Sequence, residues 1–501
     1  MSEQVDMSDS SASSGGLVKS INWKQGVIIA MGVPILIVPS IADLSVTLWA
    51  LSIVVWVVSV LSGFFLNLTL GEMCATFGVA GIGGSIQYVF RNDEKYKNKK
   101  LNVGRMIGSF GAWNYFVCWV PVIPIFTIMC GEYILTIFEF EMSTLVKTVY
   151  YLAIGIVMYS AIILMGRNGL EGGARVQMIL TIITIVPILV IALAPVILGH
   201  FDLGLVTGEF TPTNWAWDGN GILIVLGTLV VAQWSAVAWE SAATYGSEYK
   251  DPATDVPKAL IACGLICLAM YFLISFCVYG VLGQAEIEAN GATCLQAVAE
   301  LAFGQYGGII AVVLLIVGMV MIVQTAFLGA ARTIQVMATD GNLPLVFSKT
   351  NKAGVPMNAM FFETGIGVFV IVAQVTSSQI LAISATGFSI ALGLASLSFI
   401  IARKSPRFKD VPRAYKVPKA LYYCAYAMVV WEWFMLFPGI MYYLAVIDGF
   451  GISYVFIGIG VCFGYIPAWC VLQWWNHKHH PEVVCGINFD VSKDAEPTVS
   501  E

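Results

Sequence analysis

The chain has 501 residues, of which 58% are hydrophobic and 11% are charged, whereas charged residues make up about 25% of ordinary soluble domains. A soluble protein of this length would need far more polar surface, so the composition excludes a soluble globular protein and indicates a membrane protein. The net charge of −6 says little about partners, because most charged residues fall between the apolar stretches.

Apolar stretches recur along the chain at the length that a membrane-spanning helix needs, about 20 residues. Only helices or closed barrels satisfy every backbone group in lipid, and runs this long are helices. The predicted fold class is therefore an all-α membrane protein. We expect twelve spans, at 25–45, 48–70, 106–137, 147–165, 176–198, 220–245, 258–283, 306–330, 358–376, 380–401, 420–446 and 453–474.

Basic residues predict the orientation of these spans. If both termini are cytoplasmic, the loop "RNDEKYKNKKLNVGR" and the basic run from Arg403 to Lys419 lie inside. The outer loops at 199–219 and 284–305 then contain no Lys or Arg, as the positive-inside rule requires. We therefore expect a multi-pass protein of the cell membrane (plasma or inner) with both termini in the cytoplasm.

Four regions follow from this plan. Residues 1–22 are Ser-rich and polar and lack the apolar core of a signal peptide, so we expect a disordered cytoplasmic tail. A ten-helix transport core is expected at 23–402, and helices 11 and 12 with the preceding basic loop at 403–475. Residues 476–501 are predicted to be a cytoplasmic C-terminal tail.

Span one and span six carry signs of an interrupted helix. Span one contains "MGVPILIVPS", with Gly32, Pro34 and Pro39 near its middle, and Pro removes a backbone donor and clashes with the preceding turn. Span six contains "VAQWSAVAWESAATYGSEYKDP", in which small residues surround Glu240. Irregular backbone is tolerated in a bilayer where it lines a cavity. The alternative is a pair of kinks without function.

Spans one and six are the first members of two consecutive five-helix sets. Interrupted helices at corresponding positions of two halves point to a transporter site built on a 5+5 inverted repeat, although no internal sequence identity is obvious. Half-helix C-termini present carbonyls that suit an ammonium, and half-helix N-termini present N–H groups that suit a carboxylate. A zwitterionic amino acid fits such a site.

Intramembrane carboxylates are functional candidates because charge burial is expensive. Glu240 lies in the interrupted segment, so we expect it to bind and release a proton; the alternative is a Glu that caps unwound backbone. Asp43 and Glu132 fall near outer span ends and are expected to be solvated. Glu72 is expected at a helix end or in a loop. Glu363, near the cytoplasmic face, has no assigned role beyond pairing with a loop base.

Four segments of the chain carry a family resemblance. They are "GEMCATFGVAGIGGSIQYVFR", "ARVQMILTIITIVP", "WSAVAWESAATYGSEYKDPATDVPKAL" and "ARTIQVMATDGNLPLVFSKTNKAGVPMNA". Over roughly residues 20–475 the chain resembles the amino acid–polyamine–organocation superfamily of secondary transporters, which have the leucine-transporter fold with broken helices 1 and 6. It is similar in particular to bacterial amino acid/amine antiporters such as the arginine/agmatine and glutamate/GABA exchangers.

The resemblance implies roles for individual residues. Trp234, six residues before Glu240, would gate the site, and Glu240 would couple protons. Carbonyls of Ala30, Trp234 and Val237 would hold the substrate ammonium. Amides near Gly32 and Val33 would hold its carboxylate.

Departures from the family pattern bear on the substrate. Family members often have Gly-Ser-Gly or Gly-Ala-Gly in span one, where this chain has Gly32, Val33 and Pro34, so one expected N–H donor is missing. Val122 stands where the arginine exchanger has an Asn, and Ala326 where it has a Trp. An arginine-specific pocket is therefore not expected. The expected substrate-binding residues are Ala30, Gly32, Val33, Pro34, Cys118, Trp234, Val237, Glu240 and Ala326.

The sequence thus predicts a secondary active transporter for amino acids or related amines, working by alternating access as a proton-coupled permease or a substrate/product antiporter. A polyamine or biogenic-amine transporter, and a non-transporting nutrient sensor on the same fold, are the alternatives. No catalytic motif such as a P-loop or HExxH occurs, so neither an enzyme nor a cofactor is predicted.

The expected partners are the lipid bilayer and an amino acid or amine substrate. A homodimer is left open, and no nucleic-acid partner is expected. The eleven Cys lack paired spacing, and the "HKHH" run at 477–480 is interpreted as a solvated cluster, so no metal site is predicted.

Overall fold

The computed structural model describes residues 21–79, 81–91, 100–138, 142–167, 185–208, 210–244, 249–413, 415–447, 449–481 and 483–487. Within these ranges the chain forms helices joined by short connections, with two isolated β-bridges and no strand. The predicted all-α class is confirmed. Most of both predicted tails, and Arg175 ahead of span five, lie outside the described residues.

The first half of the chain contributes the following elements: α1 (Trp23–Ala30), the 3₁₀ helix η2 (Val33–Ile37), α2 (Val38–Leu48), α3 (Leu51–Phe77), α4 (Gly81–Arg91), α5 (Val103–Trp119), α6 (Val122–Phe138), α7 (Thr144–Gly166), an apolar helix Ile185–Ile197, α9 (Leu203–Thr207), α10 (Gly219–Ala236), the 3₁₀ turn η4 (Ala238–Glu240) and α11 (Ser241–Thr244).

The second half adds α12 (Pro252–Asn290), η6 (Gly291–Thr293), α13 (Cys294–Thr339), η7 (Leu345–Ser348), α14 (Met357–Val372), α15 (Ser377–Lys404), α16 (Pro406–Lys409), α17 (Lys419–Val430), the π-helix η8 (Trp431–Leu436), α18 (Phe437–Val446), α19 (Ile452–Phe463) and α20 (Tyr465–His479).

Nine stretches within the described ranges are long and apolar enough to cross a membrane, and two shorter apolar helices accompany them. One of the nine, Pro252–Thr339, includes both predicted spans seven and eight. The predicted outer loop between those spans is helical, because α12 and α13 extend into it and bend at Gly283 and Gly304, which have φ of 69° and 70°. The count of twelve spans stays a prediction.

The predicted span at 106–137 lies within the apolar stretch Val103–Phe138, which contains two helices. α5 ends at Trp119 and α6 begins at Val122. Pro121 explains the break, because it cannot donate to the carbonyl of Val117, four residues earlier. Helix three is therefore interrupted, like helices one and six.

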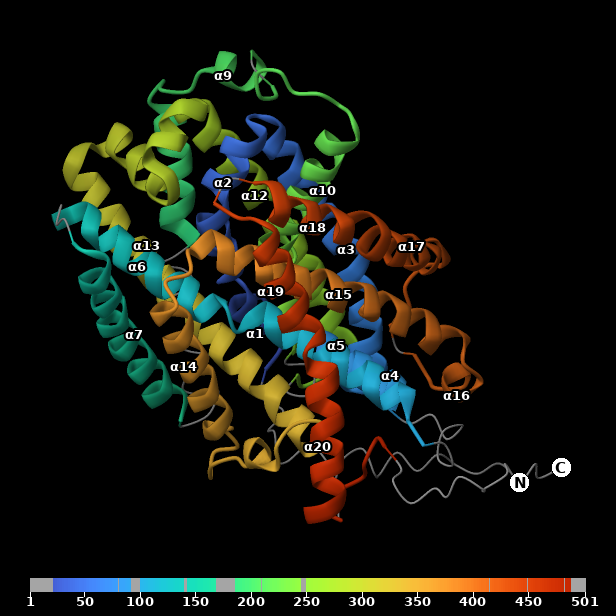
Figure 1. Cartoon of the computed structure of the whole chain (residues 1–501). Coiled ribbons are helices and arrows are strands. Elements are labelled where there is room, and N and C mark those ends of the chain that lie inside the picture. The colour runs from blue at the N-terminus through green and yellow to red at the C-terminus, as the bar shows by residue number, and fades with distance from the viewer. Residues whose placement is uncertain are drawn as a thin grey trace.

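The interrupted segments lie at the centre of the bundle. In the most apolar segment of the first span, 82% of the residues are buried, and in that of α15, 83% are buried. In the span formed by α19 and α20, only 22% are buried. η2 contacts α10, α12 and α13, and α3 packs along α12. Figure 1 shows α9 at one end of the bundle and α20 projecting at the opposite end. The interrupted first helix and α15 thus lie in the core, whereas α19 and α20 lie at its border.

The expectation that Glu72 lies at a helix end or in a loop is wrong. It lies within α3 and is fully buried. Arg403 and Arg413 donate to its two carboxylate oxygens at 2.5 and 2.8 Å, and the Val417 amide donates at 2.8 Å. A buried carboxylate persists where such charge partners offset its lost hydration. Glu72 therefore joins α3 to the end of α15 and the segment that follows it.

Candidate functional site

The first helix is interrupted where the sequence predicts. α1 ends at Ala30, and after Met31 and Gly32 the chain continues as η2, with Pro34 in its first turn. The Ala30 carbonyl would accept from the amide of residue 34 in a regular helix, but Pro has no N–H. The Gly32 amide reaches no backbone acceptor among the described residues. This break thus presents a carbonyl on one side and an amide on the other.

The sixth helix is interrupted at Val237, which follows α10 with φ −104° and precedes η4. The Val237 side chain packs against Gly63 of α3, where an added Cβ would lie 2.8 Å from it. The Val237 carbonyl accepts from Asn67 Nδ2 at 3.4 Å and from the Glu240 amide at 3.2 Å. α3 therefore supports the second break with a close approach and a donor.

One side chain of α12 joins these two breaks. The Tyr271 hydroxyl lies 2.7 Å from the Ser235 carbonyl and 3.1 Å from the Val33 carbonyl. Its ring stacks on Trp56, with centroids 5.2 Å apart. The hydroxyls of Ser40 and Ser235 also lie 3.2 Å apart. Helices one and six are thus held side by side by side-chain hydrogen bonds.

The break in helix three is tied to helix six by Trp234. Its Nε1 donates to the Cys118 carbonyl at 3.1 Å and to Ser384 Oγ at 2.7 Å. Ser384 Oγ, on α15, in turn donates to the Cys118 carbonyl at 2.8 Å and approaches the Val117 carbonyl at 3.3 Å. Trp234, proposed from the sequence as a gate, therefore spans three helices.

Glu240 ends η4 and is fully buried. Its Oε1 accepts from the Tyr115 hydroxyl at 3.1 Å and from Trp119 Nε1 at 3.3 Å. These two donors are four residues apart on α5, so they share one helix face. Its Oε2 has no hydrogen-bond donor, and no ion pair forms to it, among the described residues. A carboxyl held by neutral donors can bind a proton or receive an ammonium.

The structure places all nine predicted substrate-binding residues in the interior. Cys118, Trp234 and Glu240 meet at α5, as described above. Gly32 lies against α13, where an added Cβ would lie 2.9 Å from Met321 and 3.8 Å from Ile322. Ala326 follows on α13, one turn beyond Ile322, and makes no side-chain hydrogen bond.

Sequence reasoning missed Tyr271, Ser384 and Asn67. Each is a polar side chain within an apolar span, and the sequence does not reveal the distant carbonyl to which it donates. Of the other acids, Asp43 and Glu132 are partly exposed, and Glu363 is fully buried with no partner for either carboxyl oxygen among the described residues.

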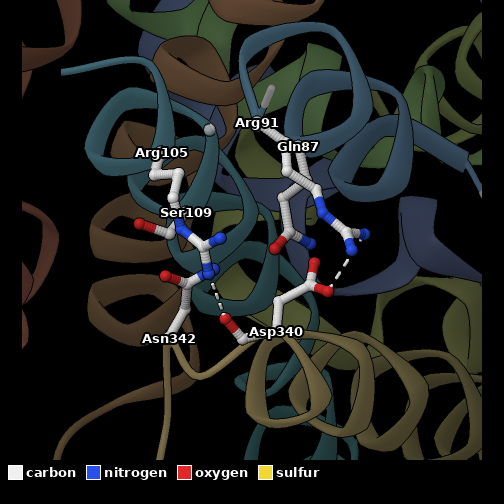
Figure 2. Close-up of a pocket in the computed structure, with 7 residues that line it drawn as sticks. Gln87, Arg91, Arg105, Ser109, Asp340 and Asn342 are labelled. Atoms are coloured by element: carbon white, nitrogen blue, oxygen red, sulfur yellow. Dashed lines mark hydrogen bonds and ion pairs between the residues drawn. The ribbon is translucent and has the colours of Figure 1, made fainter. Parts of the chain in front are cut away.

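A small polar pocket lies away from these breaks, where α4, α5 and the end of α13 meet. Arg91 Nη1 pairs with Asp340 Oδ1 at 3.0 Å, and Arg105 Nη2 donates to the Asp340 carbonyl. Figure 2 shows both guanidinium groups directed at Asp340. Burial raises the pKa of the Asp340 carboxyl, and the two arginines oppose this effect. Both arginines thus bind the same residue, so the pocket joins α4, α5 and the end of α13.

The chain matches a family model described as amino acid permease over residues 21–465. It is 25% identical to an L-lysine transport protein of Corynebacterium glutamicum over 60% of this chain and 62% of that protein. It is also 25% identical to an arginine/ornithine antiporter of Lactococcus lactis subsp. cremoris over 54% of this chain and 55% of that protein. The chain thus spans between half and two thirds of the length of these curated relatives.

Among solved structures, the chain is similar in fold to a manganese transporter of Eremococcus coleocola. The TM-score is 0.61 with 13% sequence identity, and the match covers 93% of this chain and 98% of that chain. At this identity the similarity concerns the fold alone.

We predict that Trp234→Phe lowers the free energy of unfolding in detergent by about 1 kcal/mol more than Trp239→Phe does. Both changes shrink a buried indole ring by a similar volume. Only Trp234 loses hydrogen bonds, because Trp239 Nε1 has no acceptor among the described residues. Denaturant titration of the two variants measures the difference, and equal losses would contradict the bridging role of Trp234.

Proposed function

Because the chain belongs to the amino acid permease family, we propose that it is a secondary active transporter that moves amino acids or related amines across the cell membrane by alternating access. The observation that carries the proposal is the buried carboxyl of Glu240 beside three interrupted helices. We further propose that both termini face the cytoplasm, on the distribution of basic residues.

The chemistry of the breaks supports an amine-bearing substrate. The C-terminal ends of α1 and α10 offer carbonyls and the negative ends of helix dipoles, which favour an ammonium. The Gly32 and Val33 amides at the start of η2 favour a carboxylate, although Pro34 offers no donor. Glu240 adds an acid. Relatives described as lysine and arginine/ornithine transporters are consistent with substrates that carry an additional amine.

Glu240 is our candidate for proton coupling. Its partners Tyr115 and Trp119 are neutral donors, so its charge is costly while the site is closed to water. Protonation removes that cost, and exposure of the site to solution allows release. Trp234, which connects α5, α10 and α15, is our candidate gate.

Thermal unfolding of the purified protein with a panel of amino acids, their decarboxylated amines and polyamines tests the proposal. A ligand that binds only the folded state at 100 times its dissociation constant stabilises the protein by about 2.7 kcal/mol. We expect at least one amino acid or amine to raise the unfolding temperature. Counterflow of that ligand in liposomes then separates a transporter from a sensor. Stabilisation without flux, or no stabilising ligand in the panel, would contradict transport of this substrate class.

We predict that Glu240→Gln flattens the pH dependence of uptake in liposomes between about pH 5 and 8, because the variant carries no titratable group at this position. The exposed acid Glu286 on α12 provides the control Glu286→Gln, which should keep the wild-type profile. An unchanged profile in Glu240→Gln would remove this residue from proton coupling.

A further inference from the structure

A further buried carboxyl lies in the middle of the predicted eleventh span, 420–446. Glu432 stands in the apolar run "VVWEWFMLF" and is fully buried. An acid in such a position is expensive unless it has a function. The Glu240 site does not involve it.

Local backbone geometry directs Glu432 toward helix six. It lies in η8, a π-helix in which the Phe437 amide donates to the Glu432 carbonyl, and single π-turns often occur at functional sites. Ser389 Oγ of α15 donates to the same carbonyl at 3.0 Å. The carboxyl Oε1 accepts from Gln233 Nε2 of α10 at 2.7 Å, and that nitrogen also lies 3.3 Å from Ser62 Oγ of α3.

Two side-chain oxygens of this cluster have no hydrogen-bond donor among the described residues. They are Glu432 Oε2 and Gln233 Oε1, and both are buried. Both are acceptors, so neither can satisfy the other while Glu432 is ionised. A neutral carboxylic acid supplies one O–H, and an amide facing a carboxylic acid can both donate to it and accept from it. Proton binding to Glu432 therefore supplies the missing donor.

The helices packed against η8 are α10, α15, α17 and α18. Their charged side chains lie far from Glu432 along the helix axes. α10 and α18 contain no Asp, Glu, Lys, Arg or His. The bases of α15, Arg403 and Lys404, follow Ser389 by 14 and 15 residues, about 21 Å along a helix, and Arg403 pairs with Glu72. The base of α17, Lys419, precedes Glu432 by 13 residues, about 20 Å.

The remaining titratable groups on these helices are neutral phenols and a thiol, and they make no hydrogen bond to Glu432 in the described part of the chain. They are Tyr422, Tyr423, Cys424 and Tyr426 of α17, and Tyr442 and Tyr443 of α18. A proton on Glu432 is therefore not displaced by a neighbouring base.

The cluster adjoins the proposed substrate site through α10. Gln233 immediately precedes Trp234, whose ring is bonded to Cys118 and Ser384. α10 and α18 approach backbone to backbone nearby: an added Cβ on Gly227 would lie 2.7 Å from the Gly439 carbonyl. A change at the Glu432–Gln233 contact therefore acts directly on the helix that carries Trp234.

We propose that Glu432 and Gln233 form a second proton-binding site, separate from Glu240, that links the eleventh span to helix six. Glu432 takes one proton from water to become a neutral acid and returns it to water on release. The transport consequence rests on the proposed function, but proton binding itself does not.

Infrared difference spectroscopy of the purified protein between about pH 5 and 9 tests the site, because a protonated carboxyl gives its own C=O band. We expect a pH-dependent carboxyl band that Glu432→Gln removes and Glu240→Gln leaves in place. Thr228→Val, a buried change on α10 whose hydroxyl bonds only within that helix, should leave the band unchanged. The same band in wild type and Glu432→Gln would overturn the proposal.

If Glu432→Gln does not fold, Gln233→Leu provides the decisive variant. It removes a hydrogen bond that favours the ionised carboxylate, so the pH at which the Glu432 band is half-developed should rise by about one unit or more. An unmoved midpoint would overturn the proposal. If the band behaves as expected but wild-type liposomes show no uptake, the proton site stands and the transport function fails.

Discussion

A peptide carbonyl without a donor is costly inside a bilayer, where no water can replace the missing hydrogen bond. Three helices of this protein create such carbonyls at the centre of the bundle. Side chains from neighbouring helices donate to carbonyls beside these breaks: Tyr271 to Val33 and Ser235, and Trp234 with Ser384 to Cys118. The arrangement of the core depends on these few hydrogen bonds.

Three of the buried acids fall into two groups by the partners that they have. Glu72 meets two arginines and an amide, so it persists as a charged junction between helices. Glu240 and Glu432 meet neutral donors, and each keeps one carboxyl oxygen without a donor among the described residues. Charged partners, as at Glu72, stabilise an ionised carboxylate that joins helices. Neutral partners, as at Glu240 and Glu432, suit a carboxyl that gains and loses a proton.

Sequence reasoning located the apolar spans and the first two breaks because both are local signals. Pro34 frees the Ala30 carbonyl four residues earlier, and Glu240 is visible as an acid in an apolar run. Pro121 carries the same signal in helix three, but helix three has no counterpart among the paired breaks at corresponding positions of two halves. Glu432 carries the same signal as Glu240, an acid in an apolar run.

What could not be predicted is non-local. Glu72 is separated by 331 and 341 residues from the arginines that pair with it, and Tyr271 by 238 residues from Val33. Spacing in the sequence does not reveal which helices become neighbours. The expectation that Glu72 lies at a helix end or in a loop is therefore wrong because of partners that only the folded chain brings near.

The most direct measurement of this account is the free energy of unfolding of Tyr271→Phe in detergent. The change removes one oxygen and keeps the ring that stacks on Trp56. If the hydroxyl secures the carbonyls of both interrupted helices, stability falls by about 1 to 2 kcal/mol, and the ligand found in the stabilisation panel binds more weakly. Wild-type stability and affinity in this variant would contradict the claim that side-chain donors hold helices one and six together at their breaks.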